Sequence, residues 1–141
     1  MKAILTSAFC MLLSLTIFSS TYAQNRESQT MSLEGKSFKI TLENRANPAQ
    51  VMTDEISFKD RNFDSQNARQ TGFKPEGYLY KPAGEMGDYF EFRATSEKEG
   101  TKIWNGYIKN GEVSGGMIVE KPGQPAEKYP FKGTVSTTQS K

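Results

Sequence analysis

The chain has 141 residues, of which 18 are lysine or arginine and 16 are aspartate or glutamate, and it contains one cysteine and no histidine. The absence of histidine excludes Ser-His-Asp and Cys-His catalysis as well as histidine-ligated zinc. The formal net charge is only +2, and the charges are interspersed along the chain. The chain therefore lacks the basic surplus on one face that binding to nucleic acid or to an anionic lipid surface requires.

The first 23 residues have the pattern of a cleaved export signal. Lys2 precedes an apolar run over Ala3–Phe18, and Thr21 and Ala23 are the small residues that a cleavage site needs. The run is shorter than the ~20 apolar residues that span a bilayer, so cleavage is favoured over a retained membrane anchor. We therefore expect an exported protein, periplasmic or extracellular, whose mature chain begins at Gln24.

Cleavage would also remove Lys2 and the only cysteine, Cys10, leaving 17 basic and 16 acidic residues and no disulfide. Phe9 precedes that cysteine, which argues against a lipoprotein signal. A mature chain of this length forms one domain with one modest core. We expect flexible tails over residues 24–34 and 136–141 and a β-barrel domain over residues 35–135.

After the signal, apolar and polar residues alternate with a period of two between Gly, Pro, Asn and Asp, without a sustained helical period. This pattern predicts an all-β domain. The eight predicted strands are Ser37–Leu42, Asp54–Lys59, Asn62–Ser65, Gly77–Lys81, Asp88–Ser96, Thr101–Lys109, Glu112–Lys121 and Glu127–Val135. A short helical turn is expected over Gln66–Thr71, with Ser65 as its N-cap and Gly72 at its end.

Turn chemistry predicts the register of one later hairpin. Asn110-Gly111 tolerates the positive φ angles of a type I′ turn, which pairs Lys109 with Glu112. Counting outward from this pair places Trp104 opposite Met117. One face of the hairpin is then apolar and the other mixed, as a half-buried antiparallel pair requires.

The preceding hairpin is predicted in the same way. A three-residue loop over residues 98–100, with Gly100 in the left-handed conformation, sets Glu97 opposite Thr101 and Ala94 opposite Trp104. The two turns place six side chains on one inward face: Phe90, Phe92, Trp104, Ile108, Val113 and Met117. Gly106 and Gly115 face each other beside Phe92, which favours a sharp bend and a closing barrel.

Several short motifs in the predicted strands can be compared with a known family. They are Ile56-Ser57-Phe58-Lys59-Asp60, Phe63-Asp64-Ser65, Trp104-Asn105-Gly106, Val113-Ser114-Gly115 and Tyr129-Pro130-Phe131-Lys132-Gly133-Thr134. These residues resemble small exported lipocalin-like proteins of bacteria, over most of residues 35–135. The resemblance implies an eight-stranded antiparallel up-and-down barrel that carries a small apolar ligand in its mouth. The chain departs from the family at Gly35-Lys36-Ser37-Phe38, which lacks the Gly-x-Trp signature.

In an up-and-down barrel the longer loops mark the mouth, and here these are residues 43–53, 66–76, 97–100 and 121–126. Five inward positions would line the mouth half: Ala94, Lys102, Trp104, Met117 and Tyr129. We expect them to bind a small apolar or amphipathic molecule. Lys102 could meet an anionic head group, but a lysine at a strand end is more often a solvated residue of the rim. In the alternative, aromatic side chains fill the interior and the outer surface binds another protein, as an inhibitor or an envelope module would.

Other classes of function are less favoured by the residues. Asp60–Asp64 begins like a calcium loop, but Ser65 and Thr71 stand where glycine and a closing glutamate are needed, so a hairpin turn is predicted instead. Charged outward positions such as Glu91 and Arg93 argue against a transmembrane barrel. An enzyme that uses scattered carboxylates is the least favoured alternative. We expect a monomer that is not an enzyme and needs no cofactor or metal.

Overall fold

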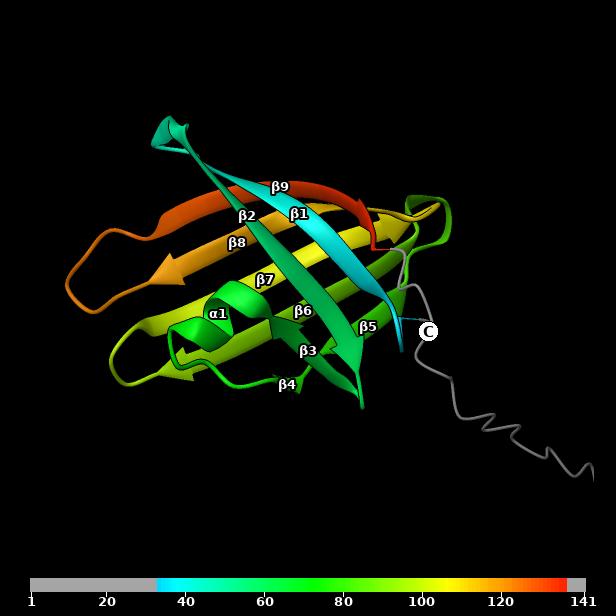
Figure 1. Cartoon of the computed structure of the whole chain (residues 1–141), viewed down its shortest axis with the longest axis horizontal. Coiled ribbons are helices and arrows are strands. Elements are labelled where there is room, and N and C mark those ends of the chain that lie inside the picture. The colour runs from blue at the N-terminus through cyan, green and yellow to red at the C-terminus, as the bar shows by residue number, and fades with distance from the viewer. Residues whose placement is uncertain (1–32, 137–141) are drawn as a thin grey trace, which may run out of the picture.

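The structure, a computed structural model, describes residues 33–136, so the predicted signal, residues 24–32 and residues 137–141 lie outside it. The described chain forms one antiparallel sheet that curls into a nearly closed barrel (Figure 1). Its strands are β1 (Ser37–Asn44), β2 (Asn47–Lys59), β3 (Asn62–Ser65), β4 (Glu76–Gly77), β5 (Leu79–Pro82), β6 (Asp88–Ser96), β7 (Gly100–Lys109), β8 (Glu112–Glu120) and β9 (Glu127–Val135). The all-β prediction is confirmed.

The strand order is β4-β3-β2-β1-β9-β8-β7-β6-β5, so the first strand pairs with the last. The predicted number of eight strands is wrong, and the described sheet has nine. The predicted strand Gly77–Lys81 is interrupted at Tyr78, because β4 pairs with β3 whereas β5 pairs with β6. The chain crosses at this point from one edge of the sheet to the other, and the Tyr78 side chain is buried beneath the crossing.

The expected loop over residues 43–53 is wrong, because β1 and β2 continue as a hairpin through most of it. The Asn44 side chain makes the turn, since its Oδ1 accepts hydrogen bonds from the backbone N–H groups of Ala46 and Asn47 at 2.9 and 3.3 Å. Such a local bond is typical of asparagine in turns. The hairpin extends β2 to 13 residues and carries it past the end of the barrel (Figure 1).

The β7–β8 register is confirmed, with Lys109 opposite Glu112 and Trp104 opposite Met117. The predicted β6–β7 register is wrong by two residues, because Ser96 pairs with Gly100 and Phe92 faces Trp104. Gly100 adopts the expected positive φ of 80° but lies in the strand pair instead of the loop. A shift of two preserves the facing of every side chain, so the six predicted inward residues are all buried.

Glycines let the strands approach closely where the sheet bends. A Cβ atom on Gly115 would lie 2.0 Å from the backbone oxygen of Asn105, and one on Gly106 would lie 2.6 Å from that of Ser114. A Cβ atom on Gly133 of β9 would lie 2.1 Å from the backbone oxygen of Lys39 in β1. These contacts agree with the expected bend at the Gly106–Gly115 pair and extend it to the β1–β9 junction.

A short helix, α1 (Gln66–Gln70), lies at one end of the barrel and packs against β2 and β3 (Figure 1). Ser65 is its N-cap, as predicted, because its side chain accepts a hydrogen bond from the Ala68 N–H at 3.1 Å. Thr71 is its C-cap, and Gly72 follows with φ of 88°. A 3-10 turn, η1 (Gly84–Met86), lies at the other end of the barrel.

The β2–β3 turn uses the left-handed conformation at two residues other than glycine, Asp60 and Arg61. The Glu34 carboxylate accepts hydrogen bonds from both of their backbone N–H groups, at 2.6 and 3.1 Å. The hairpin turn predicted over this calcium-like string is therefore present. Leu33 is fully buried, so the end of the expected N-terminal tail already contacts the barrel.

Candidate functional site

The five residues predicted to bind a ligand all project from the inward face. Trp104 lies in a lateral row with Phe92, Met117 and Tyr129 across β6 to β9, and Ala94 faces Lys102 in the next row. Four of the five, namely Ala94, Trp104, Met117 and Tyr129, are at most 7% exposed. The structure therefore brings the predicted residues together, in the half of the barrel beside α1.

Aromatic rings occupy the barrel interior between these rows. Phe63 is fully buried, and its ring centroid lies 5.5 Å from that of Phe58, 5.9 Å from Phe90, 4.6 Å from Phe92 and 5.5 Å from Trp104. Because such centroid distances are those of rings in contact, Phe63 joins opposite walls of the barrel. Phe58 extends the cluster to Phe38 and Tyr78, and Trp104 extends it to Phe131.

Trp104 is 1% exposed, and its indole Nε1 has no hydrogen-bond partner among the described residues. A buried donor without a partner costs about 1 to 3 kcal/mol. In the sheet, Trp104 is flanked by Phe92 of β6 and Met117 of β8. The predicted neighbour Ala94 faces Lys102 instead, so the small residue is not the one opposite the indole.

Lys102 is the charged member of the predicted set and points toward the α1 end. Its Nζ lies 4.6 Å from the centre of the Phe73 ring and donates a hydrogen bond to Thr71 Oγ1 at 3.3 Å. Burial lowers the pKa of Lys102, while the Asp54 and Glu99 carboxylates act in the opposite direction. Phe73 is itself buried, so the segment after α1 covers the lysine and the barrel end beneath it.

Asp54 holds α1 in this position. Its carboxylate accepts hydrogen bonds from Ser65 Oγ at 2.6 Å and from the Asn67 N–H at 3.0 Å, and it is only 7% exposed. The Asn67 side chain in turn donates to the Thr53 backbone oxygen at 2.7 Å. These bonds join the start of the helix to β2, which gives Asp54 a structural role.

Tyr129 forms a polar contact at the rim of the same end. Its hydroxyl donates to Glu127 and lies 3.4 Å from the Asn44 Nδ2 that donates to it. Burial first, and then the Glu127 carboxylate, raise the pKa of Tyr129 to about 12. The ring faces the core while its hydroxyl reaches the surface.

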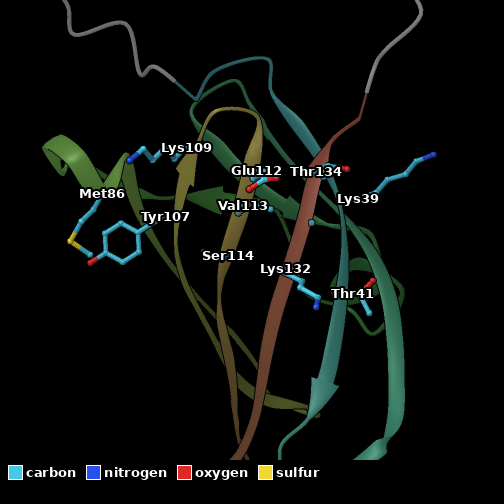
Figure 2. A pocket seen from close by; sticks show the side chains of 11 residues that line it. Lys39, Thr41, Met86, Tyr107, Lys109, Glu112, Val113, Ser114, Lys132 and Thr134 are labelled. Carbon is cyan, nitrogen blue, oxygen red and sulfur yellow. The ribbon is translucent and has the colours of Figure 1, made fainter.

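A groove of about 600 Å³ lies on the outer face of the sheet, across β1, β9, β8 and β7 (Figure 2). It is lined by Lys39, Thr41, Met86, Tyr107, Lys109, Glu112, Val113, Ser114, Lys132, Gly133 and Thr134. Figure 2 shows Met86 and Tyr107 close together at one side and Lys132 and Thr41 at the other. The groove combines three ammonium groups, one carboxylate, several hydroxyls and one aromatic ring.

Sequence reasoning did not find this groove, although it predicted part of it. The β7–β8 register already placed Tyr107 opposite Ser114 and Lys109 opposite Glu112, on the face away from the core. The missing step was the pairing of β9 with β1, which brings Lys132 beside Thr41. No turn connects these two strands, so no local signal could give their register.

Within residues 33–136, no group of three or more His, Cys, Asp or Glu side chains is placed to hold a metal ion. Neither is any helix in the range long and apolar enough to cross a membrane. No protein-family model, curated protein or solved structure matches the chain.

Proposed function

We propose that the chain is an exported binding module, not an enzyme, whose barrel interior is filled and whose outer surface recognises the partner. The observation that carries this proposal is the aromatic cluster around Phe63. Its ring lies within contact distance of rings from β2, β6 and β7, so the middle of the barrel is already occupied. A small apolar ligand needs a concave pocket of roughly 300 to 1,000 Å³.

If the inward side chains of the barrel do not bind a ligand, they stabilise the sheet instead. A core of interlocking rings makes a stiff scaffold, and a stiff sheet holds its outward side chains at fixed spacings. Binding of a partner to the outer face then requires little loss of side-chain or loop entropy, which favours affinity. The outer groove offers both polar groups and a ring on such a scaffold.

A second candidate, carriage of a small amphipathic anion, has its own supporting observation at the α1 end. Lys102 is half-buried there, and the unpartnered Trp104 Nε1 lies one row deeper. An anion that accepts hydrogen bonds from both the ammonium group and Nε1 would make use of both. This arrangement would be in keeping with a lipocalin-like relationship, which we propose only together with this candidate.

The two candidates are separated by the emission of Trp104, the only tryptophan in the chain. A filled barrel should show blue-shifted emission that does not change on addition of dodecanoate or dodecanol, and neither compound should raise the melting temperature. A carrier should respond to dodecanoate. Lys102→Met should then weaken dodecanoate binding while leaving dodecanol binding unchanged, and that result would replace our proposal with the second candidate.

The export part of the proposal has a separate test. The protein purified from an exporting host should begin at Gln24 and should be recovered without detergent. N-terminal sequencing that finds Met1 on the exported protein would contradict cleavage. Replacing Ala23 by Arg should block processing, because the cleavage site needs a small residue at that position, and Gln24→Asn is the matched control that should be processed normally.

A further inference from the structure

The groove on the outer face is built from two parallel rows of side chains, each stepping through β1, β9, β8 and β7. One row contains Thr41, Lys132, Ser114 and Tyr107, and the other contains Lys39, Thr134, Glu112 and Lys109. Neighbouring positions in each row belong to adjacent strands. The side chains therefore stand about 4.8 Å apart across the sheet, the distance between paired strands.

The groove carries a net positive charge that is open to solvent. The groove contains three lysines and one glutamate, and Lys39 and Lys132 are both exposed. The two ion pairs within residues 33–136 lie elsewhere and involve Arg69 and Arg93. Lys132 is instead flanked by the hydroxyl residues Thr41 and Ser114. An anionic group could thus meet an ammonium group and a hydroxyl donor at once.

The side of the groove beside η1 adds an apolar wall. Tyr107 is half-buried, and its ring centroid lies 5.2 Å from that of Tyr89 on β6, with an angle of 54° between the rings. Met86 of η1 is 58% exposed and lies beside Tyr107 in Figure 2. Lys109 Nζ donates a hydrogen bond to the Glu85 backbone oxygen at 2.5 Å, which ties η1 to the sheet.

These features distinguish between the kinds of anionic chain that could lie across the strands. Hydroxyl side chains both donate and accept hydrogen bonds, as the hydroxyls of a sugar do, and an aromatic ring offers a flat apolar surface to the C–H face of a sugar ring. An extended peptide presents side chains on one side only every ~6.6 Å. A step of about 4.8 Å is closer to the length of one sugar unit in an extended chain.

We infer that the groove formed by Lys39, Lys132, Ser114 and Tyr107 binds an anionic polysaccharide, that is, a chain of sugars bearing carboxylate or sulfate groups. This inference rests on the proposed function, because it names the class of partner that the outer surface recognises. The chain lies across the four strands, with its anionic groups at the lysines and one sugar ring against Tyr107. No covalent step is involved.

The test measures binding of the mature chain to oligogalacturonate, which carries carboxylates, and to sulfated dextran, with neutral dextran and poly-L-glutamate as comparisons. Calorimetry should show binding to at least one of the two anionic polysaccharides, weakening as salt is added. Neutral dextran should not bind. Comparison of oligogalacturonate with sulfated dextran identifies which anionic group the groove prefers.

Matched variants locate the binding. Lys39→Gln with Lys132→Gln should weaken binding roughly 2- to 30-fold, the range for two exposed ionic contacts. Lys98→Gln with Lys121→Gln removes the same charge from loops at the α1 end and should leave affinity unchanged. Tyr107→Phe should keep binding and Tyr107→Ala should lose it, with circular dichroism confirming that each variant is folded.

The outcomes also separate this inference from the proposed function. Tighter binding to poly-L-glutamate than to either polysaccharide would overturn the polysaccharide and point to a protein partner at the same groove. Equal loss in both lysine double variants, or no binding to any anionic chain, would overturn the groove as the site. The proposed function fails on a different readout, a response of Trp104 emission to dodecanoate.

Discussion

Truncation of Phe63 to alanine should lower the free energy of unfolding by about 3 to 5 kcal/mol, the range for removing a buried phenylalanine ring from a packed core. The side chain is fully buried, and four rings surround it at centroid distances of 4.6 to 5.9 Å. Those rings come from three strands, β2, β6 and β7, so the barrel cannot collapse locally to fill the space. The loss should therefore lie toward the upper part of the range.

Urea denaturation followed by circular dichroism measures this loss, at an m value that stays constant between variants. A domain of this size loses roughly 4 to 8 °C of melting temperature per kcal/mol, so Phe63→Ala should melt at least about 12 °C below the unmodified protein. Phe63→Leu, which keeps most of the volume, should cost less than about 1.5 kcal/mol. Leu79→Ala is the exposed control and should change stability by less than about 0.5 kcal/mol.

The same variant tests whether the barrel is filled. An apolar cavity made by truncation binds small apolar molecules such as benzene, so benzene should raise the melting temperature of Phe63→Ala and alter its Trp104 emission. The unmodified protein should not respond. A loss below about 1.5 kcal/mol, or an equal response to benzene in both proteins, would refute the claim that Phe63 fills the interior.

Three further perturbations test other parts of the structure. Gly111→Val should destabilise the domain by about 1 to 2 kcal/mol, because Gly111 has φ of 79° and an L side chain is strained there. The control is Gly77→Val, at a glycine of ordinary φ with open space around it, and it should cost less. Equal melting temperatures of the two variants would contradict the predicted turn. Ser65→Ala should cost about 0.5 to 2 kcal/mol as a lost N-cap, measured by urea denaturation. Ser114→Ala, at an exposed serine of β8, is the control and should have little effect. The pKa of Tyr129 is raised to about 12 from 10.0, so between these pH values the folded state keeps a phenolic proton that the unfolded chain has lost, and stability should fall as pH rises from 10 to 12. Tyr129→Phe should reduce the slope of that fall, and an unchanged slope would show that Tyr129 titrates normally.

Local patterns in the sequence were sufficient to predict much of the sheet. Alternation of apolar and polar residues assigned the inward and outward faces, because successive side chains of a strand point to opposite sides. Asn110-Gly111 gave the β7–β8 register because its turn restricts φ at two adjacent residues. The inward positions of Trp104 and Met117 followed from that register alone.

Local patterns gave the wrong pairing where a further strand of the sheet also determines the structure. Gly100 was expected inside the β6–β7 loop, but it pairs with Ser96, and a Cβ atom there would lie 2.1 Å from the Glu120 backbone oxygen of β8. Position 100 therefore requires glycine partly because of β8, a strand that the local turn pattern does not include. Likewise, the interruption at Tyr78 depends on which strand each half of the segment meets.

The sequence by itself therefore determined the all-β class, the Asn110-Gly111 turn and the face of the predicted strands, since these depend on φ, ψ and periodicity within a few residues. Only the tertiary structure decided the closure of the barrel through β1 and β9, which pairs Phe38 with Val135. That contact joins residues far apart in the chain, so its register depends on the whole sheet and not on a turn. The filling of the interior around Phe63 and the outer groove beside Lys132 both follow from this closure, because each combines side chains from strands that no local signal connects.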